Sequence, residues 1–252
     1  MSSDTFIYML QCVGPIMEKF PVTLYMTVMS TLLALLFGMV SAAIIKRHCP
    51  ILAKLFQLIN SFLKGVPVLV ILFIFYYSLP PLLATVATGM GMHYNVQQTH
   101  ALTFGIIAFG ITYIPYMSDM LITSYDAVPK GQLEAGYAIG MSTMQAMRRI
   151  IIPQMIVISL PVFGNHLVNI LKATALAYMI NILEMMGAAE NYAAGTQRYM
   201  ETYIVVALIY WAICIAFDKA FVFIESLVGN QRNKAHQERT RVTITHDIAE
   251  TK

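Results

Sequence analysis

The chain is organised as long apolar stretches separated by short polar segments. Asp, Glu, Lys and Arg are absent from residues 22–45, 65–118 and 150–171, and residues 202–217 are uncharged as well. A helix needs roughly 20 apolar residues to cross the hydrocarbon core of a bilayer. The stretches have room for one, two, one and one crossings, and the pattern therefore predicts membrane spans at residues 22–46, 65–87, 101–123, 150–176 and 202–226.

These five spans are predicted to be helices. Their Leu, Ile, Val, Phe and Met residues lack the strict alternation that strands of a membrane barrel show over about 10 residues. A helix also satisfies every backbone polar group internally, which lipid cannot do. The expected fold class is therefore all-α, a polytopic membrane protein with about five transmembrane helices.

The chain is expected to hold one transmembrane domain, residues 21–228, with no separate soluble domain. Residues 1–20 lack the basic start and apolar core of a cleavable signal peptide, and they are predicted to form an interfacial segment on the outer face. Residues 229–252 are predicted to form a hydrophilic cytoplasmic tail. A polar block at residues 129–153 separates the third span from the fourth.

Composition and charge support this picture and orient the chain. The sequence is 58% hydrophobic and 12% charged, and soluble domains carry about twice that charged fraction. Lys and Arg gather between spans one and two, between spans three and four, and after span five, whereas the other side holds Lys19, Lys172 and Arg198. Basic loops face the cytoplasm, so we expect the N-terminus outside and the C-terminus inside. The net charge of +3 then reflects topology, and nucleic acid is not an expected partner.

The polar block has the pattern of two short helices joined at a glycine corner. Pro129 can open the first helix, because a first turn does not need the N–H that proline lacks. Gly140 stands where a glycine cap would close that helix. Ser142, with Gln145 three residues later, predicts a capping box at the start of the second helix. Pro153 is then expected to halt or redirect the chain as it re-enters the membrane.

The charged residues of the block suit these two helices. Glu134 lies early in the first helix, and Arg148 and Arg149 end the second, where each charge matches the helix dipole. If the corner folds the two helices together, Glu134 is expected to pair with one of the arginines. The alternative is an ordinary cytoplasmic loop with solvated charges, which leaves the joint spacing of these residues unexplained.

This block resembles the signature loop of ABC-importer permeases, which reads Glu-Ala-Ala, three residues, Gly, nine residues, Ile, one residue, Leu-Pro. The chain has Gly for the second Ala and Ile for Leu, and its matching residues are Glu134-Ala135-Gly136, Gly140, Ile150, Ile152 and Pro153. The resemblance covers most of the chain and points to the polar amino-acid uptake branch. Further matches to that branch are Phe62-Leu63-Lys64-Gly65-Val66-Pro67, Val128 to Gln132, and Leu160-Pro161.

The resemblance implies a type I permease fold in a bacterial cytoplasmic membrane, together with several partners. A second permease subunit, identical or related, would complete the pathway, and a cytoplasmic ABC ATPase dimer would drive it. An extracytoplasmic solute-binding protein would deliver the amino acid. A short coupling helix, roughly Glu134 to Ala146, would sit in a groove on the ATPase. The implied coupling positions are Glu134, Ala135, Gly136, Gly140, Met141 and Ser142.

The chain is not expected to be an enzyme or to bind a cofactor or metal. It has no Gly-x-x-x-x-Gly-Lys-Ser/Thr phosphate loop and no Gly-Lys pair at all. ATP and Mg²⁺ would therefore belong to the partner subunit. The 3 cysteines and the histidines show no metal-ligand spacing, and no hydroxyl, His and acid are grouped as a nucleophile with its base.

Polar residues inside spans are costly there and mark candidate positions on the solute pathway. Asn165, Asn169 and Lys172 share one face of span four, at spacings of i, i+4 and i+7, and His166 lies beside them. The alternative role for the asparagines is hydrogen bonding at the interface with the second permease subunit.

Span three adds Tyr116 and Asp119, which lie one helical turn apart, and Asp119 is expected to be a structural or snorkelling carboxylate. His166 and Ala173 stand where the branch often has Glu and Asp. The missing acids favour cystine or another neutral or zwitterionic amino acid over a cationic one. The competing hypothesis is an ATP-independent transporter or channel for a small polar solute, which would leave the polar block at residues 129–153 unexplained.

Overall fold

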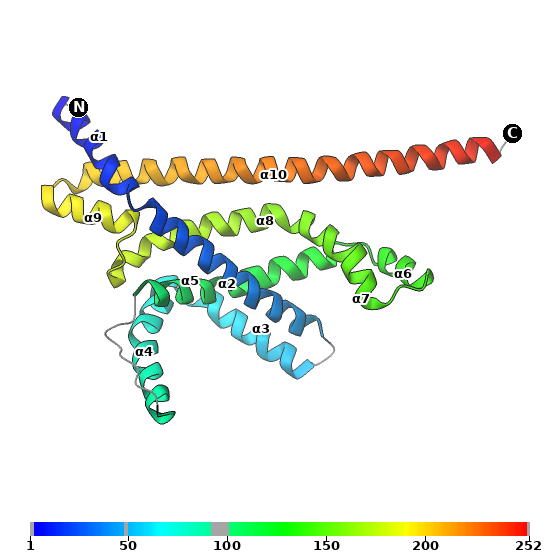
Figure 1. The fold of residues 1–252 in the computed structure, drawn as a ribbon, viewed down its shortest axis with the longest axis horizontal. Coiled ribbons are helices and arrows are strands. Elements are labelled where there is room, and N and C mark those ends of the chain that lie inside the picture. Colours follow the sequence, from blue (N-terminus) through cyan, green and yellow to red (C-terminus); the bar gives the residue numbers. More distant parts are fainter. Residues whose placement is uncertain (1–2, 48–49, 92–100, 251–252) are drawn as a thin grey trace.

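The computed structural model describes residues 3–47, 50–91 and 101–250. Side chains are described for residues 4–47, 50–91 and 101–228. All the elements in these residues are helical and none is a strand, which confirms the predicted all-α class. The helices labelled in Figure 1 are α1 (Ser3–Met17), α2 (Phe20–Lys46), α3 (Pro50–Gly65), α4 (Val68–Gly89), α5 (Ala101–Asp126), α6 (Lys130–Ala138), α7 (Thr143–Ala146), α8 (Ile152–Ala173), α9 (Met185–Thr196) and α10 (Tyr199–Glu250). A π-helical segment, Met147–Ile151, joins α7 to α8, and a 3₁₀ segment, Thr174–Ile180, follows α8.

The helices α2 and α5 pack along each other at the centre of the fold, and α8 lies against both. Buried side chains fill the space between the three helices; they are Ala34, Met117, Met120 and Ile170. A second buried cluster joins α2 and the starts of α4 and α5 to the 3₁₀ segment; it contains Met26, Ile71, Leu72, Ala108, Phe109, Ala177, Ile180 and Ile182. Beyond its start, α4 turns away from the central pair (Figure 1).

Gly38 allows α2 and α5 to approach closely. A Cβ at this position would lie 2.6 Å from the Met117 Cβ and 3.2 Å from the Ser118 backbone nitrogen. Neither atom belongs to the flexible end of a side chain, so the two helices would have to separate. Small residues at such contacts let membrane helices gain dispersion energy, which matters because lipid provides no hydrophobic effect between them.

Gly38→Ala is expected to destabilise the protein by about 1–3 kcal/mol, because overpacking a tight contact costs that much. The measurement is the midpoint of thermal unfolding of the detergent-purified protein. Gly89→Ala is the matched control, since a Cβ there meets nothing within 4 Å. Equal midpoints for the two variants would contradict the close packing of α2 on α5.

Among the described residues, five helices are long and apolar enough to cross a membrane, as the sequence predicts. They are Phe20–Lys46, Val68–Gly89, Ala101–Asp126, Thr143–Ile180 and Tyr199–Val228. The fourth begins well before the predicted start at residue 150, because α7, the π-helical segment and α8 form one continuous helix.

Two further helices, α3 and α9, connect spans that were predicted to be joined by loops. Pro50 begins α3, where a proline is favoured. The apolar residues of α3 recur at helical spacing and are exposed; they include Ile51, Leu55, Leu58 and Phe62. This helix lies beside α2 and α5, and it is amphipathic.

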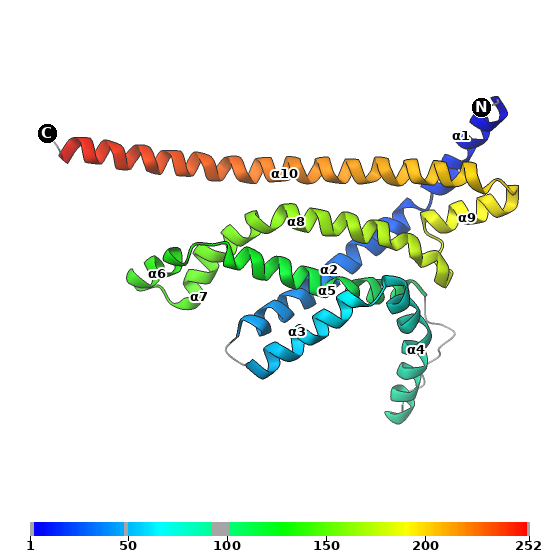
Figure 2. The same ribbon diagram turned by 180° about the vertical axis from the view of Figure 1, so that it is seen from behind.

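The first and last described helices, α1 and α10, take up most of the predicted N-terminal segment and C-terminal tail. Tyr8, Cys12 and Ile16 of α1 are buried against α9 and α10, so the predicted interfacial segment at residues 1–20 packs on the membrane domain. The helix α10 continues past residue 228 to Glu250 and extends beyond the other helices (Figure 2), so it includes most of the predicted tail. The α6–α7 region and the C-terminal end of α10 lie toward one end of the molecule, and α1 and α9 lie toward the other.

Candidate functional site

The polar block between α5 and α8 folds as the predicted pair of helices with a glycine corner. The last residue of α6 is Ala138, and Gly140 follows with a φ of 81°. The Gly140 N–H donates to the Tyr137 carbonyl at 2.9 Å, and the Met141 N–H donates to the Gly136 carbonyl at 3.0 Å. These two bonds make a Schellman ending, whose left-handed residue favours glycine.

Ser142 starts α7 through the predicted capping box. Its Oγ accepts a hydrogen bond from the Gln145 N–H at 3.3 Å, and the Gln145 Oε1 accepts one from the Ser142 N–H at 2.9 Å. The chain therefore reverses direction between Gly140 and Ser142 with its backbone groups paired. The corner stands out from the helices α5 and α8 that carry it (Figure 1).

Gly136 brings α6 onto the helix that begins with α7. It is buried, and a Cβ there would lie 3.1 Å from the Ile150 Cδ1 and 3.6 Å from the Ala146 Cβ. Gly136 therefore serves packing inside the corner. Of the other predicted coupling positions, Met141 is half-buried and four are exposed: Glu134, Ala135, Gly140 and Ser142.

The helix does not end at Pro153, so the prediction that this proline halts the chain is wrong. The segment Met147–Ile151 forms a π-helical turn, in which the Ile152 N–H donates to the Met147 carbonyl. Pro153 then occupies the first turn of α8. Because the wider turn shifts the hydrogen-bond register just before a residue that cannot donate, the helix accommodates the proline without a break.

Arg148 and Arg149 consequently lie within a continuous helix and do not end one. In the described part of the chain, Glu134 forms no ion pair with either arginine, so the predicted pairing is also wrong. Glu134 instead lines a cavity of about 340 Å³ between the end of α5 and α6, together with Asp126 and Tyr137. Its carboxylate is exposed.

The predicted pathway residues of span four lie on the side of α8 that faces away from the rest of the chain. Asn165, Asn169 and Lys172 are exposed, and His166 is half-buried. The other side of α8 is buried, and it includes Ile170, which packs between α2 and α5 in the centre of the fold, and Leu171. A single chain therefore leaves the polar side of α8 uncovered, which suits either a solute pathway or an interface with a second subunit.

Tyr116 and Asp119 of α5 meet side chains from two other helices. The Tyr116 and His166 ring centroids are 5.8 Å apart, and the Lys64 Nζ lies 6.0 Å from the Tyr116 ring centroid. Lys64 and Asp119 form an ion pair whose side chains are 35% and 54% exposed. The four residues thus connect α3 and α5 with the polar side of α8.

A buried carboxylate that sequence reasoning missed lies where α2, α9 and α10 meet. Glu184 is fully buried. Its Oε1 accepts from the Gly187 N–H at 2.9 Å, and its Oε2 accepts from the Tyr210 hydroxyl at 2.9 Å and the Thr23 hydroxyl at 3.3 Å. Burial raises the pKa of Glu184 above its ordinary value of 4.5, against the hydrogen bonds, which lower it. The sequence did contain one signal for this site, since Glu184 is the only acidic residue from residue 150 to residue 189.

The His, Cys, Asp and Glu side chains of the described residues lie apart from one another. No group of three or more His, Cys, Asp and Glu side chains there is placed to hold a metal ion. Cys12 and Cys214 are free thiols in different parts of the fold, and Cys49 lies outside the described residues. The features available for function are the α6–α7 corner, the polar side of α8 and the contacts between α3 and α5.

Known proteins are similar to this chain in both sequence and fold. Residues 34–229 match the family described as "Binding-protein-dependent transport system inner membrane component". The chain is 34% identical over 218 residues to the probable amino-acid permease protein YxeN of Bacillus subtilis (strain 168), across 86% of this chain and 93% of the relative. It is 31% identical over 231 residues to the L-cystine transport system permease protein TcyL of the same organism, across 90% of each.

A solved structure extends this similarity to three dimensions. It is described as the crystal structure of an amino acid ABC transporter with histidines, and it aligns with a TM-score of 0.73 at 27% sequence identity. The alignment covers 89% of this chain and 99% of the solved chain, which confirms the permease fold that the signature loop implies. The polar block and α8 both fall within the matched range of 34–229, and the chain belongs to the family of binding-protein-dependent transport system inner membrane components.

Proposed function

We propose that this protein is the permease subunit of an ATP-driven importer, which takes an amino acid from a binding protein outside a bacterial cytoplasmic membrane. The observation that carries the proposal is the exposed α6–α7 corner, where Gly140 closes one helix and Ser142 caps the next. The corner contains the signature spacing of ABC-importer permeases. Similar proteins named as an amino-acid permease and an L-cystine permease support an amino acid as the solute.

The corner is the proposed contact with a cytoplasmic ATPase dimer. Two permease subunits, identical or related, would each seat this corner in a groove on one ATPase. Glu134 offers a carboxylate there, and a charge-assisted hydrogen bond to a cationic side chain is stronger than one between neutral groups. Movement of the corner on ATP binding would pass into the membrane through the helix Thr143–Ile180.

This arrangement requires the corner and the C-terminus to be cytoplasmic and the N-terminus to be outside. Two observations support that orientation. The loops predicted to be cytoplasmic carry most of the basic residues, and the corner lies toward the same end of the molecule as the C-terminal end of α10 (Figure 1).

The polar side of α8 is the proposed lining of the solute pathway. Asn165 and Asn169 are exposed and carry amides, which both donate and accept hydrogen bonds. The Lys172 ammonium can bind a carboxylate. His166, in contact with Tyr116, continues the polar lining toward α5.

A neutral or zwitterionic solute such as cystine is favoured over a cationic one. His166 and Ala173 provide no carboxylate to the pathway, and Lys172 adds a positive charge beside Ala173. A cationic side chain would meet like charge there, which is unfavourable. The similar proteins differ on this point, since one is named for L-cystine and another for histidine, lysine, arginine and ornithine.

The test is the ATPase activity of the full complex, purified with its co-isolating ATPase and reconstituted in proteoliposomes with its binding protein. L-Cystine, L-glutamine and L-arginine would be added separately, and stimulation by L-cystine or L-glutamine is the expected result. Stimulation by L-arginine alone would overturn the assigned solute and leave the importer intact. Solute uptake that continues without ATP would overturn the importer in favour of an ATP-independent transporter.

A further inference from the structure

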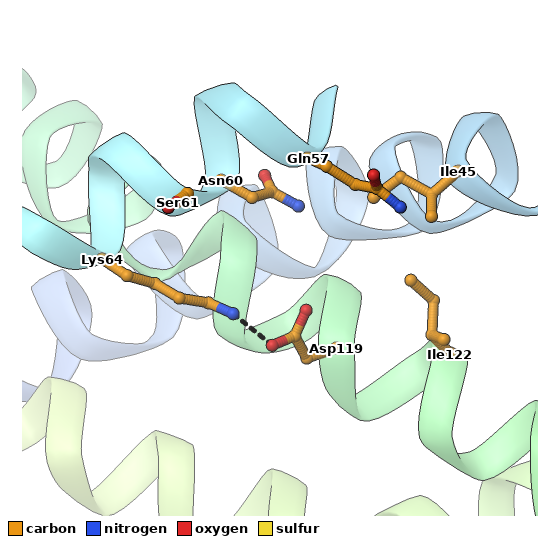
Figure 3. Close-up of a pocket in the computed structure, with 7 residues that line it drawn as sticks. All are labelled: Ile45, Gln57, Asn60, Ser61, Lys64, Asp119 and Ile122. Atoms are coloured by element: carbon orange, nitrogen blue, oxygen red, sulfur yellow. Dashed lines mark hydrogen bonds and ion pairs between the residues drawn. The ribbon is translucent and has the colours of Figure 1, made fainter. Parts of the chain in front are cut away.

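A second polar site lies between α2, α3 and α5. It is a cavity of about 340 Å³, whose lining includes Gln57, Asn60, Ser61, Lys64 and Asp119. Figure 3 shows the Lys64 and Asp119 side chains reaching toward each other from α3 and α5. Small-molecule pockets begin at about 300 Å³, so this cavity suits a ligand of amino-acid size.

The helix α3 turns its polar side toward this cavity and its apolar side away. Gln57, Ser61 and Lys64 recur at helical spacing on the cavity side. Leu58 and Phe62, on the other side, are 68% and 65% exposed. In a bilayer the exposed apolar side faces lipid, so the charged pair is held on the protein side of the helix, where polar groups are retained for function.

Buried hydrogen bonds fix the walls of the cavity independently of the charged pair. The Asn60 Nδ2 donates to the Ser41 Oγ at 3.0 Å, and the Ser118 Oγ donates to the same oxygen at 3.2 Å. These bonds join α3, α2 and α5. Because the walls are already held in place, Lys64 and Asp119 can change partners without moving the helices.

We propose that Lys64 and Asp119 form a second subsite for the amino-acid solute, an inference that rests on the proposed import function. The Lys64 ammonium would bind the solute α-carboxylate, and the Asp119 carboxylate would bind the α-ammonium. Opening the pair leaves neither charge without a partner, because a zwitterion supplies two new ion pairs in exchange. The subsite thus recognises the part of the solute that all α-amino acids share.

The subsite is continuous with the polar side of α8. The Tyr116 ring contacts both the Lys64 Nζ, at 6.0 Å, and the His166 ring, at 5.8 Å. Asp119 lies two helical turns before the end of α5 at Asp126, which leads into the proposed cytoplasmic corner. A solute moving inward along α8 would therefore meet this pair last, and the exposed pair is suited to weak binding and release.

Saturation-transfer difference NMR on the full, nucleotide-free complex in nanodiscs tests the subsite without turnover or a binding protein. L-Alanine is the probe, because it carries both charges and little side chain. All variants would be made in an Asn169→Ala background, which weakens binding along α8. There, Lys64→Met and Asp119→Asn are each expected to raise the half-saturating L-alanine concentration at least about tenfold, through loss of a charge-assisted contact.

Lys54→Met is the matched control, since Lys54 is exposed on the same helix and does not line the cavity. It is expected to leave L-alanine binding unchanged. N-Acetyl-L-alanine, which lacks the ammonium, is expected to compete at least about tenfold less well than L-alanine.

Two results would overturn the subsite and leave the ion pair a structural one. The first is the absence of saturable L-alanine binding, and the second is equal binding in Lys64→Met and Lys54→Met. Lys64→Met and Asp119→Asn are each compared separately with Lys54→Met, so one comparison remains if either test variant fails to assemble. The ATPase assay distinguishes failure of the import function from failure of the subsite. An ATPase that does not respond to solute, together with normal L-alanine binding, would count against import and not against the subsite.

Discussion

Replacing Gly140 by valine is expected to reduce solute-stimulated ATP hydrolysis by the reconstituted complex at least about tenfold, a loss equivalent to about 1.4 kcal/mol. Gly140 has a φ of 81°. That left-handed conformation costs a residue with a Cβ roughly 1–2 kcal/mol, and it is a true outlier for a β-branched one. A Cβ at this position meets nothing within 4 Å, so the effect comes from the backbone and not from a clash. The Schellman hydrogen bonds would break, and α6 would no longer be held against α7.

Three measurements define the outcome for Gly140→Val: the amount of chain in the membrane, the amount of ATPase that co-purifies, and ATP hydrolysis with and without solute. Membrane insertion is expected to be normal, while co-purification and stimulation fall. Gly131→Val is the matched control, because Gly131 lies in α6 with open space around it. Wild-type stimulation in Gly140→Val would contradict the corner's role, and an equal loss in Gly131→Val would show that bulk anywhere in α6 is harmful.

Glu184→Ala is expected to destabilise the protein by roughly 3–5 kcal/mol. The substitution leaves the Gly187 N–H and the Thr23 and Tyr210 hydroxyls without their shared acceptor in a buried site, and each unsatisfied buried group costs about 1–3 kcal/mol. Glu184→Gln is the matched variant. Its amide oxygen can still accept from Gly187, and the two hydroxyls can rotate to accept from its NH₂ group, so a loss of only about 1 kcal/mol is expected.

Thermal unfolding in detergent would measure both variants, with a drop in midpoint of more than about 6 °C expected for Glu184→Ala. The pH dependence gives a second measurement. Burial raises the folded-state pKa of Glu184 above 4.5, so ionising the group costs stability at pH values above the raised pKa. As the pH falls from neutral toward 4.5, that cost disappears and the wild type should gain stability relative to Glu184→Gln. A constant difference between the two proteins over this range would contradict the raised pKa.

The corner was predictable because its chemistry is local. Gly140, and Ser142 with Gln145, act on backbone groups within a few residues, so their spacing alone determines the structure. The five spans were predictable for a similar reason, since span length depends on a count of consecutive apolar residues. The start of the fourth span was not predictable by such a rule, because the helix begins at Thr143 and includes Arg148 and Arg149, which a count of uncharged residues leaves out.

Contacts between distant segments could not be read from spacing. The ion pair of Lys64 with Asp119 joins two different helices. The helix α3 was not predicted, because its lysines were interpreted as those of a cytoplasmic loop. Glu184 is a single acid whose hydroxyl partners, Thr23 and Tyr210, come from other helices. The hydrogen bonds of Glu184 depend on how α2, α9 and α10 pack together, and that tertiary arrangement cannot be read from residue spacing.

The helix that continues through the π-helical turn links the corner to the polar side of α8, so in the proposed importer a movement of the corner would tilt α8. With a rise of about 1.5 Å per residue, the 22 residues of α8 span about 33 Å. A tilt of about 10° would move one end of such a helix sideways by ~6 Å relative to the other end, which is comparable to the 5.4 Å pitch of a helical turn. The wider turn at Met147–Ile151 lies between the corner and α8, so its stiffness would determine how much of a movement imposed on the corner by the proposed ATPase reaches Asn169 and Lys172.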